Sequence, residues 1–319
     1  MGLINTIKMH AAIASGDFGK MFKNTKLPVL PQAVSSVVEE VNKDEPDVTV
    51  LENIIAAEPE FSVKVLSTVN SSLFALRAKV TGVRHAITLL GFDRIRSVIL
   101  SYSMLEAMPR PEGDLFDHEA YWTDTLLRAL LAQSVARRVR PGEEEEAFTA
   151  MLVADVAVPV LLTTWREYYE PILKNWRGGR HSLSGLERDA YGWDHAQASA
   201  WILQKWDFPE QLVCLVGAHT LTHDQIKEYG MDDSVADCVA VASQLPSSMV
   251  RDHVRCERMI ASAADNLELP RDAWPEIYDE VEQKFEAVYA QFNLTSDHAH
   301  QTLDSLSYAI RKLNEELVV

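Results

Sequence analysis

Cysteine is scarce in this chain of 319 residues, which contains only Cys214, Cys238 and Cys256. No two of them form a CxxC pair, and an odd, widely spaced set argues against a disulfide framework and for a reducing compartment. Glycine and proline contribute 13 residues each, which excludes collagen-like and low-complexity chains. We therefore predict a globular protein of the cytoplasm.

Positive charge is also in short supply. The chain has 30 lysine and arginine residues against 47 acidic residues, so its net charge is −17 at pH 7. Such a chain repels phosphate backbones and anionic membrane surfaces, and we predict neither a nucleic-acid nor a membrane partner. A basic cluster is the local exception, and we expect it to pair with the acidic run Glu143–Glu146. Its members are Arg128, Arg137, Arg138 and Arg140.

A secretory signal and an uninterrupted membrane span are missing as well. The N-terminal segment lacks the basic start and the apolar core that a signal sequence needs. The longest apolar run, residues 147–165, has Asp155 and Pro159 in its middle. A buried helix tolerates these two residues better than a membrane span does. We therefore interpret the run as a helix of the protein core.

Apolar residues at helical spacing run through most of the chain. In residues 35–43 and 50–57 the apolar side chains lie three and four positions apart, as one face of a helix requires. The polar segment between them offers Asp47 or Thr49 as a cap for the second helix. Alternating strand patterns bounded by Asn-Gly or Asp-Gly turns are missing. We predict an all-α fold.

The C-terminal part differs in charge from the rest. Residues 257–319 contain 13 acidic and 5 basic residues, a net charge of −8. Two amphipathic helices joined by NLTSD predict a helical hairpin. We expect its apolar stripe to pack on the main domain, and a dimer or partner surface is the alternative. The stripe consists of Trp274, Ile277, Val281, Phe285, Val288 and Phe292, followed by Leu303, Leu306, Ile310, Leu313 and Leu317.

Phosphate-binding loops, dinucleotide-binding loops, nucleophile elbows and HExxH motifs are all missing. What remains is a set of acids inside apolar helical segments, Asp124, Asp155 and Asp237, together with His195 and His219. A buried carboxylate needs a partner, and acids and histidines are suitable ligands for a divalent metal. The alternative is that a cap, an arginine or a backbone group satisfies each of them separately.

Several longer segments resemble one known family. They are LPVLPQAVSSVVEEV, IIAAEPEFSVKVLSTVNSSLF, VTGVRHAITLLGFDRIRSVIL and YGWDHAQASAWILQKWDFPEQLVCLVGAHT. They are similar to the HDOD domain (HD-related output domain), an all-helical bacterial signalling module related to HD-type metal phosphohydrolases. The resemblance implies an HDOD domain over residues 27–245, an N-terminal helical extension over 1–26 and a C-terminal helical extension over 246–319.

The resemblance also allows a comparison with the metal ligands of catalytic HD enzymes. Their first histidine corresponds to Asp124 here, and their His-Asp pair to Ala154-Asp155. A later histidine is retained as His195. A further histidine pair has become Ala218-His219, and the final aspartate corresponds to Asp237.

The histidines replaced by Asp124, Ala154 and Ala218 are missing from the ligand set. Their loss should disable a two-metal centre, in which each ion needs several ligands. A single divalent metal held by Asp124, Asp155, His195, His219 and Asp237 remains chemically plausible. We predict no catalytic residue and no other cofactor. The function that the resemblance implies is a non-catalytic regulatory protein that acts through contacts with signalling proteins, with a homodimer as an open alternative. The competing hypothesis is a divergent metal-dependent phosphohydrolase acting on a phosphoester or a cyclic nucleotide.

Overall fold

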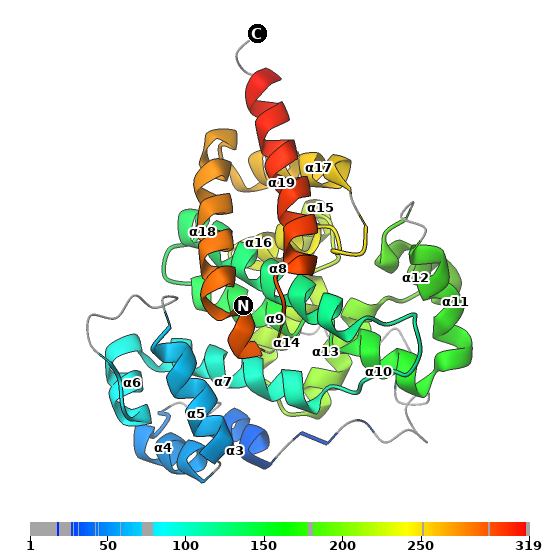
Figure 1. Ribbon diagram of the computed structural model, residues 1–319. Helices are drawn as coiled ribbons and strands as arrows, with labels where there is room; N and C mark the ends of the chain where they lie inside the picture. The colour runs from blue at the N-terminus through cyan, green and yellow to red at the C-terminus, as the bar shows by residue number, and fades with distance from the viewer. Residues whose placement is uncertain are drawn as a thin grey trace.

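The computed structural model describes residues 18, 27, 29–30, 32–41, 43, 45–57, 59–71, 79–177, 181–250, 252–292 and 294–316. Within these residues every regular element is a helix and none is a strand, as Figure 1 shows. The prediction of an all-α fold is therefore confirmed. The predicted N-terminal extension lies outside the described residues except for Phe18, whose ring is buried against Trp193 and Trp201.

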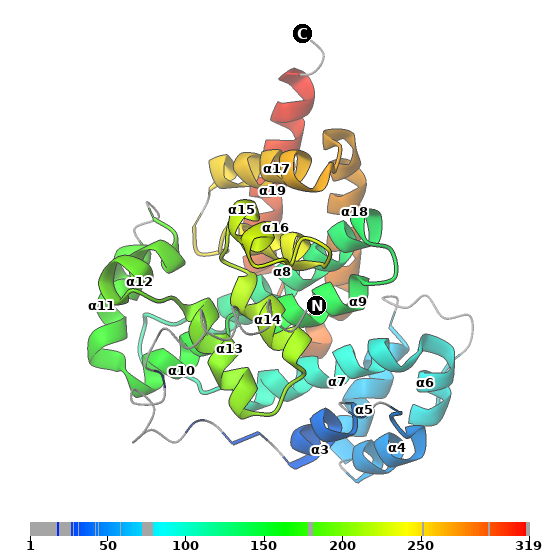
Figure 2. The same cartoon turned by 180° about the vertical axis from the view of Figure 1, so that it is seen from behind.

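The N-terminal helices gather at one end of the molecule in both Figure 1 and Figure 2. They are α3 (Gln32–Val41), α4 (Val48–Ala56), α5 (Pro59–Val69), α6 (Val83–Leu90) and α7 (Phe92–Ala107). Of the two caps that the sequence offers for α4, Asp47 is the one used, and its carboxylate accepts the Thr49 backbone N–H. Gly91 separates α6 from α7 with a φ of +85°, which a side chain would strain.

The middle of the chain forms the largest group of helices. They are α8 (His118–Val139), α9 (Glu144–Leu152), α10 (Ala157–Thr164), α11 (Arg166–Trp176), α12 (Leu183–Tyr191), α13 (His195–Lys205), α14 (Glu210–Ala218), α15 (His223–Glu228) and α16 (Ala236–Ser243). Helix α8 is their centre. It packs against α9 and α16, and on other sides it contacts the C-terminal helices α18 and α19.

The longest apolar run is interrupted, contrary to its interpretation as one helix. Helix α9 ends at Leu152 and α10 begins at Ala157, so Asp155 lies in the turn between them. Pro159 explains the break, because it has no N–H to donate to the carbonyl of Asp155. That carbonyl accepts the Val158 N–H instead. The stretch Glu144–Thr164 is long and apolar enough to cross a membrane, but 89% of its apolar window is buried in the fold.

The C-terminal helices extend to the opposite end from α3–α6 (Figure 1, Figure 2), although η2 contacts α5. They are α17 (His253–Leu267), η1 (Arg271–Ala273), α18 (Trp274–Val288), η2 (Tyr289–Phe292) and α19 (Asp297–Glu316). The predicted hairpin is present as α18 and α19. Its apolar stripe is buried from Trp274 to Val288, and both helices pack on α8. The stripe from Trp274 to Leu313 therefore belongs to the core, and Leu317 lies outside the described residues.

The expected pairing of the basic cluster with Glu143–Glu146 is wrong. Arg137 and Arg138 form salt bridges with Glu280 of α18, and Arg140 pairs with Asp233. The end of α8 lies beside α18, so its arginines meet the acidic face of that helix. Within the acidic run, Glu145 pairs with Arg94 of α7.

Lys284 of α18 predicts a pH-dependent stability. Its ammonium group contacts Glu280 and Gln133, yet burial and the nearby arginines lower its pKa from 10.5 to about 7. Between these two values the unfolded chain binds the proton that the folded protein has lost, so stability rises with pH across this window. We expect Lys284→Met to increase the free energy of unfolding by about 2 kcal/mol at pH 6, and by much less at pH 10.

Urea unfolding at the two pH values measures the difference. Gln283→Met is a suitable control, because Gln283 is exposed on the same helix. An equal gain from Lys284→Met at both pH values would contradict a charge effect.

Candidate functional site

A cavity of about 540 Å³ lies among α8, α12, α13, α14, α16 and α17. All of the predicted metal ligands line its wall, although they come from five separate parts of the chain. Asp124 lies on α8, Asp155 in the turn before α10, His195 at the start of α13, His219 at the end of α14, and Asp237 on α16.

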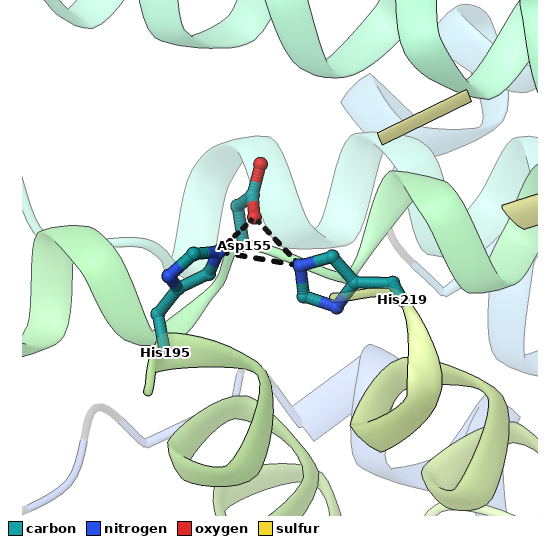
Figure 3. A group of neighbouring side chains, drawn as sticks. All are labelled: Asp155, His195 and His219. Carbon is teal, nitrogen blue, oxygen red and sulfur yellow. Dashed lines mark hydrogen bonds and ion pairs between the residues drawn. The ribbon is translucent and has the colours of Figure 1, made fainter. Parts of the chain in front are cut away.

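Three of these residues meet at one point, shown in Figure 3. Asp155 Oδ1 lies 3.3 Å from His195 Nε2 and 3.3 Å from His219 Nε2. The two imidazole nitrogens are also 3.3 Å apart. All three side chains are buried, and within the described residues they form a cluster with the spacing of metal ligands.

Helix ends hold the two histidines in place. Asp194 is the N-cap of α13, and with Gln197 it forms a capping box that fixes His195 as the first helical residue. His219 is the C-cap residue of α14. Its backbone carbonyl accepts the Ser243 hydroxyl, which ties this end of α14 to α16.

Outer contacts fix the orientation of both rings. His219 Nδ1 lies 2.7 Å from the Val216 carbonyl, an acceptor, so this nitrogen carries the proton. His195 Nδ1 meets the carboxylate of Glu187, which also accepts the His195 backbone N–H and the Tyr169 hydroxyl. Metal-binding histidines usually donate their second N–H to such an acceptor. Both Nε2 atoms are thereby directed at Asp155.

The resulting cluster needs a cation or a proton. With both Nδ1 atoms protonated, a neutral His195 and a neutral His219 would direct lone pairs at the Asp155 carboxylate, and these repel. Burial by itself would lower the pKa of His195, but the carboxylates of Glu187 and Asp155 outweigh it and raise that pKa well above its ordinary value. Burial opposes the charge of Asp155 as well, yet its contacts with the two histidines hold its pKa well below the usual range.

Arg128 of α8 forms a salt bridge with the other carboxylate oxygen of Asp155. Its Nη1 lies 3.0 Å from Oδ2, and its Nε donates to the Leu245 carbonyl. The guanidinium fixes the carboxylate so that Oδ1 faces the histidines. It also supplies a positive charge that balances part of the acid in the cavity.

The other two predicted ligands lie outside this cluster. Asp124 accepts hydrogen bonds from the Ser247 hydroxyl and the Ser248 N–H, and burial raises its pKa. Asp237 lies 3.0 Å from His223 Nδ1, and burial raises its pKa too. Each carboxylate thus has its own partners, which corresponds to the alternative interpretation of buried acids.

Sequence reasoning missed Glu187, Arg128 in its role beside Asp155, and Tyr169. Glu187 is fully buried although its neighbours Arg188 and Asp189 are exposed. Glu187 is one of two acids in the polar segment SGLERDAY, and nothing in that segment signals its burial. A search for an acceptor for the second nitrogen of His195 is the one argument that would have led to it.

Comparison with known proteins identifies the family. The sequence pattern described as the HDOD domain matches residues 27–221, more than half of the chain. The chain belongs to the HDOD domain family. The predicted family is therefore confirmed. A search of curated proteins gave no significant match.

Solved structures share the fold of this HDOD protein. An "HDOD domain protein with unknown function" from Geobacter sulfurreducens is 14% identical with a TM-score of 0.65, over 87% of this chain and 98% of its own. A "Putative phosphohydrolase" from Shewanella amazonensis is 21% identical with a TM-score of 0.60, over 95% and 96%. A "Putative metal-dependent phosphohydrolase" from the same organism is 17% identical with a TM-score of 0.60, over 89% and 99%. At these identities the likeness concerns the fold.

The cluster fits a single divalent metal. Ligands about 2.1 Å from a tetrahedral ion lie about 3.4 Å apart, close to the 3.3 Å spacing observed here. Two imidazoles and one carboxylate suit zinc, iron or manganese. A metal held by Asp155, His195 and His219 would supply a Lewis acid at the cavity wall. Contacts with Glu187, the Val216 carbonyl and Arg128 would hold His195, His219 and Asp155 in the orientation that binds the metal.

Proposed function

We propose that this HDOD protein is a regulatory module that binds one divalent metal and acts by binding and not by turnover. The observation that carries the proposal is the three-residue cluster of Asp155, His195 and His219, whose outer contacts direct all three ligand atoms at one point. A cavity of about 540 Å³ gives this point access to a small ligand.

The ligand count supports a binding role. A two-metal phosphohydrolase needs several ligands for each of two ions about 3.5–4 Å apart. Here Asp124 is held by Ser247 and Ser248, and Asp237 by His223. Arg128 lies on the side of Asp155 from which a second ion would bridge the carboxylate. These contacts favour one metal over two.

Protein contacts are the proposed output. The apolar stripe of the C-terminal hairpin is used internally, so a signalling partner would meet its outer, acidic face. Glu276, Asp279 and Glu286 lie on that face of α18. A partner with a basic surface would complement it, and a homodimer through this face would juxtapose like charges.

A phosphohydrolase acting on a phosphoester or a cyclic nucleotide is the second candidate. One specific observation favours it: the three-residue cluster lies in a cavity wall, and a metal with only three protein ligands keeps an open position, as catalytic zinc sites do.

Elemental analysis of the purified protein, before and after incubation with manganese, iron and zinc, tests the metal. We expect roughly one ion per chain, as three ligands with outer contacts would hold. The metal-loaded protein is then incubated with cyclic dinucleotides and generic phosphoesters. We expect no turnover above that of Asp155→Ala. Robust hydrolysis that disappears in Asp155→Ala would establish the enzyme and reject the binding role.

A further inference from the structure

The C-terminal extension contributes to the wall of the site cavity. Helix α17 begins after residue 252, outside the family match of residues 27–221. Arg255, Ser262 and Asn266 of this helix nevertheless line the cavity together with the three-residue cluster. A ligand in the cavity would therefore touch the HDOD core and the C-terminal extension at the same time.

Arg255 has an unused charge. Its side chain is only partly exposed, and among the described residues its guanidinium makes no hydrogen bond and no salt bridge. Asp252 is nearby, but its carboxylate caps α17 by accepting the Arg255 backbone N–H. A partly buried guanidinium without a partner is costly, so the protein gains by supplying it with an anion.

Arg128 places a second positive charge on the wall of the same cavity. Burial lowers the pKa of Arg255, and the charge of Arg128 lowers it further. Arg128 cannot move away easily, because Asp155 and the Leu245 carbonyl hold it. Two guanidinium groups on the wall of one cavity are suitable partners for a phosphate or a carboxylate.

The rest of the cavity indicates what kind of molecule would carry the anionic group. Phe116, Trp176 and Leu183 form an apolar part of its wall. The volume of about 540 Å³ lies in the range of small-molecule sites. Arg188 also lines the cavity, but it is paired with Asp194, which leaves Arg255, with Arg128 on the same wall, as the place for the charged group.

We propose that Arg128 and Arg255 form an anion-binding subsite that takes the phosphate or carboxylate group of a small organic molecule. Its occupancy links α8 of the HDOD core to α17 of the C-terminal extension. This deepens the proposed regulatory function, since it names the ligand chemistry and a route from the cavity to the outer helices. It does not depend on the metal.

Isothermal titration calorimetry of the full chain, as purified and after loading with manganese, tests the subsite. The probes are inorganic phosphate, adenosine monophosphate and citrate, with adenosine as the neutral control. We expect at least one anion to bind, and adenosine to bind far more weakly than its monophosphate. A preference for citrate or for adenosine monophosphate distinguishes a carboxylate from a phosphate ligand.

Arg255→Gln is the deciding variant, because it keeps the length and polarity of the side chain. Loss of one charge-assisted contact should weaken binding of the anion by roughly 10- to 100-fold. Arg258→Gln is the matched control on an exposed position of the same helix, and it should bind like the parent chain. Metal content should be the same in all three proteins, which separates this result from failure of the metal site.

Hydrogen exchange reports the link to the extension. Bound anion should slow hydrogen exchange in residues 253–267 of the parent chain. The same anion should leave exchange in Arg255→Gln unchanged. The proposal is wrong if no anion binds with a Kd below about 1 mM, or if Arg255→Gln binds as tightly as Arg258→Gln does. An anion that binds tightly but leaves hydrogen exchange in α17 unaltered would equally overturn the proposed link between α8 and α17.

Discussion

Asp155→Ala is expected to abolish metal binding at the proposed site. The carboxylate supplies one of three ligand atoms, and it also holds Arg128 away from the histidines. Loss of an outer partner alone weakens metal sites by about 10- to 100-fold. Loss of a ligand, which also frees a guanidinium beside the site, should therefore exceed about 100-fold. Competition with a chromogenic chelator measures the affinity.

Asp237→Ala is the informative control for this experiment. Sequence comparison places Asp237 among the ligands, whereas in the structure it pairs with His223 outside the three-residue cluster. We expect Asp237→Ala to retain its metal at nearly the parent affinity. Equal loss in both variants would show that the five-residue ligand set of the family pattern is correct and that the three-residue site is too small.

Glu187→Ala is expected to have the largest effect on stability. Glu187 is fully buried and accepts hydrogen bonds from the His195 backbone, the His195 ring and the Tyr169 hydroxyl. Removing one partner of a buried charged network typically costs about 3–5 kcal/mol, since the remaining groups stay buried and unpaired. Chemical denaturation of the metal-free chain at neutral pH measures the loss.

Two further variants make the result specific. Asp189→Ala changes an exposed acid on the same helix and should alter stability very little. Glu187→Gln keeps a carbonyl acceptor for His195, so we expect a smaller loss than with alanine. If Glu187→Ala were as stable as Asp189→Ala, the carboxylate would not be holding the ring of His195.

The local pattern of the chain predicts much of the fold. Helical spacing indicates α4, α18 and α19, and the cap Asp47 follows from residue type and position. The turn at Asp155 was missed because apolar composition continues through it, although Pro159 was visible. Partners such as Glu280 for Arg137 and Arg138 lie more than 140 positions away. Side-chain type alone does not reveal which distant helix covers which face.

The site is predictable to a similar degree. The resemblance selected all three residues of the cluster, since His195, His219 and Asp155 stand at family positions. It also selected Asp124 and Asp237, whose separate partners arise from nearby serines and from His223. The outer contact from Glu187 depends on how α12 packs beside α13, a relation that no local spacing encodes.

Helix α8 contacts segments on both sides of the predicted boundary at residue 245. One of its faces carries Asp124 and Arg128 toward the cavity, and its last turns hold Arg137 and Arg138 against α18. A shortened chain that ended at residue 245 would expose to water the apolar surface that Trp274 and Phe285 now cover. The family segment and the C-terminal helices should therefore melt in a single cooperative transition. An HDOD domain without these C-terminal helices would need polar residues in place of the apolar surface that α8 presents to them.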